Sequence, residues 1–248
     1  MLAMILGAVP LLSPQPVLVN GHLQSVASIS QVPANGWVGY TFMATHTMST
    51  CGCRLGNDSE NISDVHKAPS EAFLFIQMRE GQANRVRFFT PTCEIDAGGE
   101  TVTWIDKVSQ EESIAFLRHQ VENAPEHGKG GALFALSMHS GATDTLIDIA
   151  RHNPSSHLRG EALFWLSQQA GEKAAAALRD AVDNDPEESV RSKAVFGIAQ
   201  LPNDESIPLL ADLMKHNKSR EVRKKAAFWL GQKNDPRALD VLTDVLRQ

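Results

Sequence analysis

Cysteines are the residues whose type and spacing most directly suggest chemistry in this chain of 248 residues. Cys51, Cys53 and Cys93 all lie in the N-terminal half. In an oxidising compartment we expect Cys93 to pair with Cys51 or Cys53, because a bond within Cys-Gly-Cys would close a small, strained ring. The alternative is a metal site to which His46 or His66 adds a fourth ligand, but zinc sites favour Cys-x2-Cys spacing. The pattern favours one disulfide and no metal.

Other catalytic patterns are missing from the sequence. It holds no Ser or Cys nucleophile elbow, no Gly-rich phosphate loop and no metalloprotease helix motif. The D-A-G-G segment at 96–99 offers too few oxygens for a calcium loop and is typical of a turn. The sequence therefore predicts a protein that is not an enzyme, with no catalytic residues and no cofactor.

A second set of residues recurs at a regular interval in the C-terminal half and could recognise a polypeptide. Aromatic rings offer apolar contact area, side-chain amides can bond to backbone groups, and ammonium groups flank both. The predicted partner-binding residues are Phe134, Phe164, Phe196, Phe228, Gln168, Gln200, Gln232, Lys193 and Lys225.

A repeat must position these side chains. Similar segments recur as GALFAL at 131–136, EALFWL at 161–166, KAVFGI at 193–198 and KAAFWL at 225–230. Between them Leu146, Leu178, Leu210 and Leu242 fall 32 residues apart. A period in this range is typical of a stacked solenoid, so each segment is expected to lie on the second helix of a helix pair.

Helical geometry places the phenylalanines away from the face that packs on the partner helix. Counting from Lys129, Arg159, Arg191 and Arg223 as position zero of each second helix, positions −1, +3 and +7 form the packing stripe. The phenylalanine at +5 lies about 160° from the centre of that stripe. We therefore expect a row of rings on the concave wall. Three explanations stay open: a groove for a peptide, a dock for the chain's own β part, or packing between neighbouring repeats.

Two further positions of the repeat are interpreted as structural. Asn153, Asp185 or Asn217 stands six residues before the arginine of each later repeat and is expected to tie successive turns together by hydrogen bonds. Trp165 and Trp229 directly follow a phenylalanine, and both are expected to fill gaps between repeats. Gly197 takes the same position in the repeat between them and is expected to leave room for one of these rings.

The segments VRSKAVFGI at 190–198, VRKKAAFWL at 222–230 and NDPRALDVL at 234–242 resemble bacterial HEAT-like repeats of the short kind, which include the PBS-lyase type. The resemblance implies a right-handed α-solenoid over about half of the chain. For function it implies a range, because such repeats serve scaffolds, pigment-attachment lyases and enzyme accessory domains. Some HEAT-repeat hydroxylases bind two irons through His-Glu dipeptides, and this sequence contains none.

The first half of the chain has a different composition. Alternating or β-branched runs predict strands at 37–44, 72–78, 85–90 and 101–105, while the composition of 49–70 predicts a long loop. The fold class is therefore α+β, a small antiparallel β module followed by the solenoid. The expected domains are an apolar or signal segment at 1–27, a β-rich module at 28–106, and a solenoid of about four helix pairs plus a closing helix at 107–248.

Charge and the apolar start narrow the choice of partner and location. A net charge of −6, with 17 basic and 20 acidic residues over 110–248, argues against nucleic acid. The run MLAMILGAVPLL is too short to span a bilayer and has the length of a signal peptide's apolar region, which favours an extracytoplasmic protein. The sequence thus predicts an exported scaffold that binds a protein or peptide and does not fix its oligomeric state. The alternative is a lyase-like or accessory protein that handles a small flat ligand with a reactive cysteine.

Overall fold

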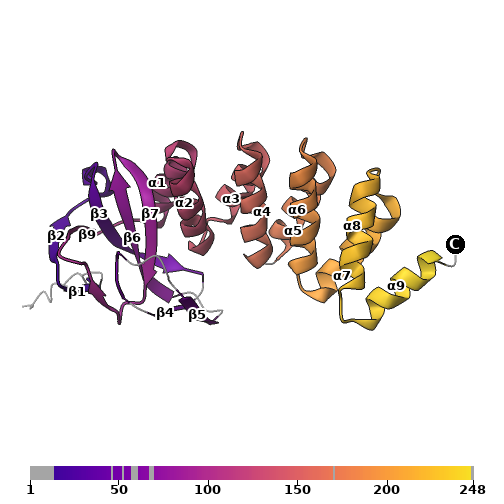
Figure 1. The fold of residues 1–248 in the computed structure, drawn as a ribbon, viewed down its shortest axis with the longest axis horizontal. Coiled ribbons are helices and arrows are strands. Elements are labelled where there is room, and N and C mark those ends of the chain that lie inside the picture. The colour runs from indigo at the N-terminus through magenta and orange to yellow at the C-terminus, as the bar shows by residue number, and fades with distance from the viewer. Residues whose placement is uncertain are drawn as a thin grey trace, which may run out of the picture. The chain divides into compact units, whose positions relative to one another are not determined.

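The chain folds into two compact units. The computed structural model describes residues 14–45, 47–51, 53–56, 61–66, 70–169 and 171–246. The two units divide between Phe116 and Leu117, within helix α1 (Gln110–Asn123). The first unit holds the sheet and the second holds the helical repeats, which confirms the α+β class with a C-terminal helical solenoid (Figure 1).

The sheet of the first unit has five strands in the order β2-β9-β3-β6-β7. Their bounds are β2 His22–Val26, β9 Thr101–Ile105, β3 Gly36–Ala44, β6 Ser70–Arg79 and β7 Gln82–Phe89. β3, β6 and β7 pair antiparallel, whereas β9 runs parallel to both β2 and β3. The sheet is mixed because the chain crosses over after β7 and adds β9 on the far side of β3. The prediction of an antiparallel sheet is correct for strands β3, β6 and β7, whereas β2 and β9 join this sheet in parallel.

Two strand pairs lie where the sequence predicted no strands. β4 (Thr47–Cys51) pairs antiparallel with β5 (Asn61–His66), so the long loop predicted for 49–70 is wrong at these residues. β1 (Val17–Val19) pairs parallel with β8 (Glu94–Asp96). β1 and β2 both lie inside the segment expected to be separate at 1–27; the apolar run itself, residues 1–12, falls outside the described residues.

A disulfide joins Cys53 to Cys93 within the core of the first unit. Cys93 is buried among the apolar residues of this core, and Cys53 packs against them. The pairing decides between the two disulfides that the sequence allowed. It also removes two of the three thiolates on which the metal site and the reactive-cysteine alternative depended. The side chain of Cys51 lies outside the described part of the chain.

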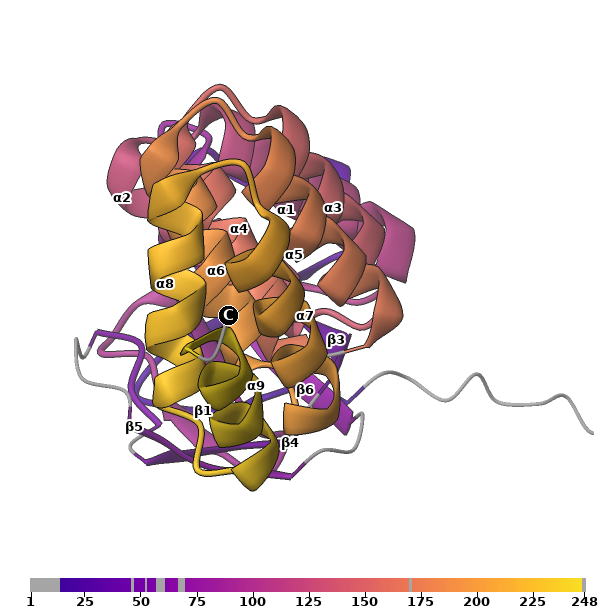
Figure 2. The same ribbon diagram turned by 90° about the vertical axis from the view of Figure 1, so that its right-hand side faces the viewer.

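The second unit stacks its helices in two layers. After α1 come α2 Glu126–Met138, α3 Thr143–His152, α4 Ser156–Gln169, α5 Glu172–Asn184, α6 Glu188–Gln200, α7 Asn203–His216, α8 Arg220–Gly231 and α9 Pro236–Leu246. Figures 1 and 2 show α4, α6 and α8 in one layer and α3, α5 and α7 in the other. No helix among the described residues has the length and apolarity needed to cross a bilayer.

The predicted packing stripe is the buried side of the second helices. Val190, Ala194 and Ile198 of α6 are all at most 1% exposed. The corresponding residues of α4 and α8 are buried in the same way: Leu158, Ala162, Leu166, Val222, Ala226 and Leu230. Burial of this stripe between the two layers fixes the rotation of each second helix, and hence the direction of its phenylalanine.

Each turn between paired helices is held by an Asn or Asp side chain. The side-chain oxygens of Asn153, Asp185 and Asn217 accept a hydrogen bond from the backbone N–H two residues later, each at 2.9 Å. The arginine six residues on then donates to the carbonyl of that same turn residue, as Arg191 does to Asp185 O at 2.7 Å. The interpretation of these two positions as structural is confirmed, but these bonds lie within one turn and do not tie successive turns together.

One arginine also reaches the next repeat. Arg159 donates from Nε and Nη2 to both carboxylate oxygens of Asp185, at 2.8 and 2.9 Å, and the two side chains are only 8% and 5% exposed. Burial alone would raise the pKa of Asp185, but hydrogen bonds from Arg159 and from the N–H of Glu187 lower it below its usual value. This bidentate pair joins α4 to the turn before α6.

We expect Asp185→Asn to remove a pH-dependent part of the stability. Because the pKa of Asp185 is lower in the folded state, its contribution is complete above the unfolded pKa of about 3.9 and is lost as the pH falls through the folded value. At pH 7 the substitution should cost about 2 kcal/mol, since it leaves Arg159 buried without its anion. Urea unfolding between pH 7 and 3 should therefore show a stability difference from the wild type that narrows toward acid.

Asp144→Asn is the matched control. Asp144 pairs with Lys173 on the surface, where the two side chains are 75% and 69% exposed. This substitution should change stability by less than about 1 kcal/mol. If Asp185→Asn loses equally little stability, or if its loss stays constant with pH, the buried pair of Arg159 with Asp185 does not stabilise the fold as described.

Candidate partner-binding face

The four phenylalanines of the repeat lie on one layer of helices but are not equally open. Phe164 of α4 is 39% exposed and Phe228 of α8 is 57% exposed. Phe134 of α2 and Phe196 of α6 are half-buried. Packing wholly inside the inter-repeat core is thereby excluded for Phe164 and Phe228, whereas whether the row binds a peptide or another part of the chain stays a prediction.

Two tryptophans explain why Phe134 and Phe196 are less exposed than Phe164 and Phe228. The Trp165 ring lies 4.8 Å from the ring of Phe134 in the preceding repeat and 5.0 Å from that of Phe164 in its own helix. Two repeats later, Trp229 lies 5.0 Å from both Phe196 and Phe228. Each tryptophan thus fills a gap between repeats, as predicted, and covers the phenylalanine of the preceding repeat.

No tryptophan of the following repeat covers Phe164, because Gly197 holds the corresponding position in α6. A Cβ atom at Gly197 would lie 2.5 Å from Leu178 Cδ2, so the space beside this glycine is occupied. The prediction that Gly197 leaves room for a tryptophan is therefore wrong: a leucine of α5 takes that room. Phe228 is open for a different reason, since α8 is the last helix of this layer in the described part of the chain.

Two polar residues that the sequence analysis missed accompany the tryptophans. Gln169 donates from Nε2 to Ser137 O at the end of α2, at 3.1 Å, and Lys233 donates from Nζ to Ala199 O at the end of α6, at 2.6 Å. Burial lowers the pKa of Lys233, while nearby Asp235 opposes the shift. Both residues stand four positions after a tryptophan, so their joint recurrence was a signal in the sequence.

The polar part of the predicted surface is mostly open. Gln168, Gln200, Gln232 and Lys193 are exposed, and Lys225 is half-buried. The stem of Lys193 passes over α4, where a Cβ atom at Gly160 would lie 2.5 Å from Lys193 Cδ. We call the surface formed by Phe164, Phe228, the three glutamines and the two lysines the aromatic face.

The aromatic face can supply apolar contact, amide hydrogen bonds and positive charge. Helices that pack side by side are 8–10 Å apart, so Phe164 and Phe228, separated by α6, lie roughly 16–20 Å from one another. An extended chain advances about 3.3 Å per residue. Two apolar side chains of one bound segment could reach both rings if they stand about five or six residues apart.

Comparison with known proteins identifies the repeats. Residues 175–248 match the family described as HEAT repeats, so the second unit carries HEAT-like repeats. HEAT repeats generally serve as protein-interaction scaffolds. None of the curated proteins matches the chain.

Among the solved structures that are similar to this chain is human deoxyhypusine hydroxylase in complex with glycerol. The identity is 21% and the TM-score 0.40, and the match covers 53% of this chain and 43% of the hydroxylase. This chain therefore spans less than half of that enzyme's length. The likeness concerns the repeat architecture alone.

The prediction that the chain is not an enzyme has to be corrected. It rested on motifs missing from the sequence, which do not by themselves exclude catalysis, and one similar structure is that of an enzyme, human deoxyhypusine hydroxylase. A repeat architecture does not decide between a scaffold and an enzyme.

The two kinds of phenylalanine should differ in their contribution to folding. Phe196→Ala should lower the free energy of unfolding by about 2 kcal/mol because it removes the ring that packs under Trp229. Phe228→Ala should cost less than about 1 kcal/mol, since that ring is mostly in solvent. Urea unfolding of the two variants tests the difference. The variants Phe134→Ala and Phe164→Ala provide the same test for the two rings beside Trp165. Equal costs within either pair are incompatible with the covering role of the tryptophans.

Proposed function

We propose that the aromatic face binds an extended segment of a partner polypeptide. The observation that carries the proposal is the exposure of Phe164 and Phe228 on one layer of helices, each backed by a tryptophan. Two large apolar rings held open by the packing of their neighbours are a surface that stability alone does not require.

The glutamines favour an extended backbone as the ligand. Gln168, Gln200 and Gln232 occupy the same position on three neighbouring helices and are exposed. Each amide carries both a donor and an acceptor, so a row of them can pair with the N–H and C=O groups of a strand. Aromatic rings beside such a row would hold the apolar side chains of the same segment.

The charge of the face favours acidic residues in the partner. Lys193 and Lys225 flank the rings on α6 and α8, and neither forms an ion pair among the described residues. Complementary carboxylates in the partner would steer association and fix the register. We therefore expect a segment with two apolar side chains about five or six residues apart and acidic residues near them.

The disulfide bears on the location and on the alternative function. A bond between Cys53 and Cys93 is consistent with the export that the sequence predicts, because disulfides persist in oxidising compartments. It leaves Cys51 as the one cysteine that the reactive-thiol alternative could use. We therefore favour the partner-binding function, in an extracytoplasmic setting.

Selection of peptides displayed as random 12-residue sequences would test this function while the partner is still unidentified. We expect the wild-type chain to enrich peptides that contain spaced apolar residues and acidic residues. The double variant Phe164→Ser/Phe228→Ser should bind the selected peptides at least tenfold more weakly, a loss of about 1.4 kcal/mol.

Leu239→Ser is the matched control for this selection. Leu239 is 65% exposed and lies on α9, outside the layer that carries the aromatic face. Removing it deletes an equally open apolar side chain, so peptide binding should be unchanged. Peptides that bind the double variant as tightly as the wild type would place the binding surface elsewhere.

A further inference from the structure

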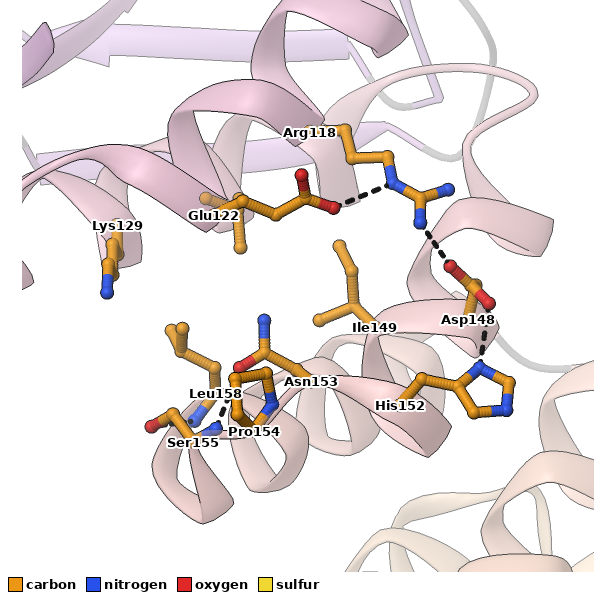
Figure 3. Close-up of a pocket in the computed structure, with 11 residues that line it drawn as sticks. Arg118, Glu122, Lys129, Asp148, Ile149, His152, Asn153, Pro154, Ser155 and Leu158 are labelled. Carbon is orange, nitrogen blue, oxygen red and sulfur yellow. Dashed lines mark hydrogen bonds and ion pairs between the residues drawn. The ribbon is translucent and has the colours of Figure 1, made fainter.

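A cavity of about 290 Å³ in the second unit lies apart from the aromatic face. It opens beside the turn between α3 and α4, next to the C-terminal half of α1 (Figure 3). The residues that line it are Arg118, Val121, Glu122, Lys129, Asp148, Ile149, His152, Asn153, Pro154, Ser155 and Leu158.

The next repeat shows how the residues that correspond to Lys129 and Asn153 pair with each other. There Arg159, at position zero of its helix, donates two hydrogen bonds to the carboxylate of Asp185 in the next turn. In the first repeat, position zero is Lys129, and the residue of the next turn is Asn153. A lysine and an amide thus replace an arginine and a carboxylate. The next repeat has its own cavity, of about 230 Å³, beside Asp185, but Arg159 does not line it, whereas Lys129 lines the cavity of the first repeat.

Asn153 presents a donor to this cavity. Its Oδ1 accepts the backbone N–H of Ser155 at 2.9 Å, which fixes the orientation of the amide group. The Nδ2 group is left to face the space that Figure 3 shows between Asn153, Ile149 and Glu122. Asn217, by contrast, uses its Nδ2 to donate to Asp183 Oδ1 at 2.9 Å. The Nδ2 of Asn153 has no protein acceptor among the described residues.

Lys129 presents a second donor. Its one ion pair within the described part of the chain is with Glu126, at an N···O distance of 3.7 Å, and its side chain is 22% exposed. Lys129 and Asn153 therefore both border the cavity as donors, whereas the next repeat brings a donor and an acceptor together. An acceptor group of a bound ligand could pair with Lys129 and Asn153, as the carboxylate of Asp185 pairs with Arg159.

The carboxylates already in the cavity wall are committed to other partners. Arg118 lies between Glu122 and Asp148, with N···O distances of 3.0 and 2.5 Å. Asp148 also accepts from His152 at 2.8 Å. Figure 3 shows these contacts as a chain along one side of the cavity, away from Lys129. Lys129 takes no part in this network, and its own ion pair with Glu126 is long, at 3.7 Å.

We propose that the cavity binds a carboxylate group, which takes the place that Asp185 occupies beside Arg159. The carboxylate accepts hydrogen bonds from Lys129 Nζ and Asn153 Nδ2, and Ile149 and Leu158 contact its carbon atoms. The volume suits a small acid or the end of an acidic side chain. The site does not depend on the aromatic face or on its function.

Titration of the full chain followed by the NMR signal of the Asn153 side-chain amide tests the proposal. The probes are acetate, succinate and the blocked peptide acetyl-Ala-Asp-Ala-amide, at constant ionic strength set with sodium chloride. We expect a saturable shift with a Kd on the order of 1–10 mM. Saturation by acetate or succinate alone assigns the site to free acids, and saturation by the peptide alone assigns it to acidic side chains.

Two variants provide the controls. The double variant Lys129→Arg/Asn153→Asp supplies an internal carboxylate, as in the next repeat, and should fold with a raised melting temperature while binding every probe at least tenfold more weakly. Lys129→Met should weaken binding by a similar factor without supplying the internal anion, and it serves as the test if the double variant does not fold. The peptide acetyl-Ala-Asn-Ala-amide should give no saturable shift.

The proposal is overturned by any of three results. These are the lack of a saturable shift with all three acids up to about 100 mM, an equal shift with chloride, or unchanged binding by Lys129→Met.

Discussion

In the helical unit, the size of one side chain on the second helix of each repeat determines which phenylalanine rings are exposed. This side chain follows the phenylalanine of the repeat and alternates between small and large, as Ala135, Trp165, Gly197 and Trp229. A tryptophan covers the ring of the preceding repeat, at 4.8 Å for Phe134 and 5.0 Å for Phe196. A small residue leaves the preceding ring in solvent, as Gly197 does for Phe164.

The alternation groups the repeats in pairs. Within a pair, the tryptophan packs between two phenylalanines, and Gln169 or Lys233 bonds to the carbonyls that end the preceding helix. Between the two pairs no tryptophan intervenes; there Gly197 packs beside Leu178, and Arg159 forms its buried ion pair with Asp185. The interfaces of this solenoid thus differ in their packing, so neighbouring repeats are not energetically equivalent.

The sequence predicted the helices well because the 32-residue period and the helical spacing of apolar residues both reflect packing within each repeat. The segment at 193–198, for example, was expected on the second helix of a pair and lies in α6, Glu188–Gln200. Which rings are open was not predictable, because it depends on contacts between repeats, such as Leu178 filling the space beside Gly197. The strand pair of β4 with β5 was missed because its residues are polar and rich in turn formers. Lys129 lines the cavity beside Asn153, whereas Arg159 does not line the cavity of the next repeat, and a consensus pattern conceals this difference.

Site-specific fluorine NMR would test the central claim most directly. 4-Fluorophenylalanine would replace Phe134, Phe164, Phe196 and Phe228 one at a time, and a soluble paramagnetic chelate would be added to each protein. The structure predicts strong line broadening for the labels at positions 164 and 228 and several-fold weaker broadening at 134 and 196. Equal broadening at all four positions, or protection of positions 164 and 228, would contradict the account.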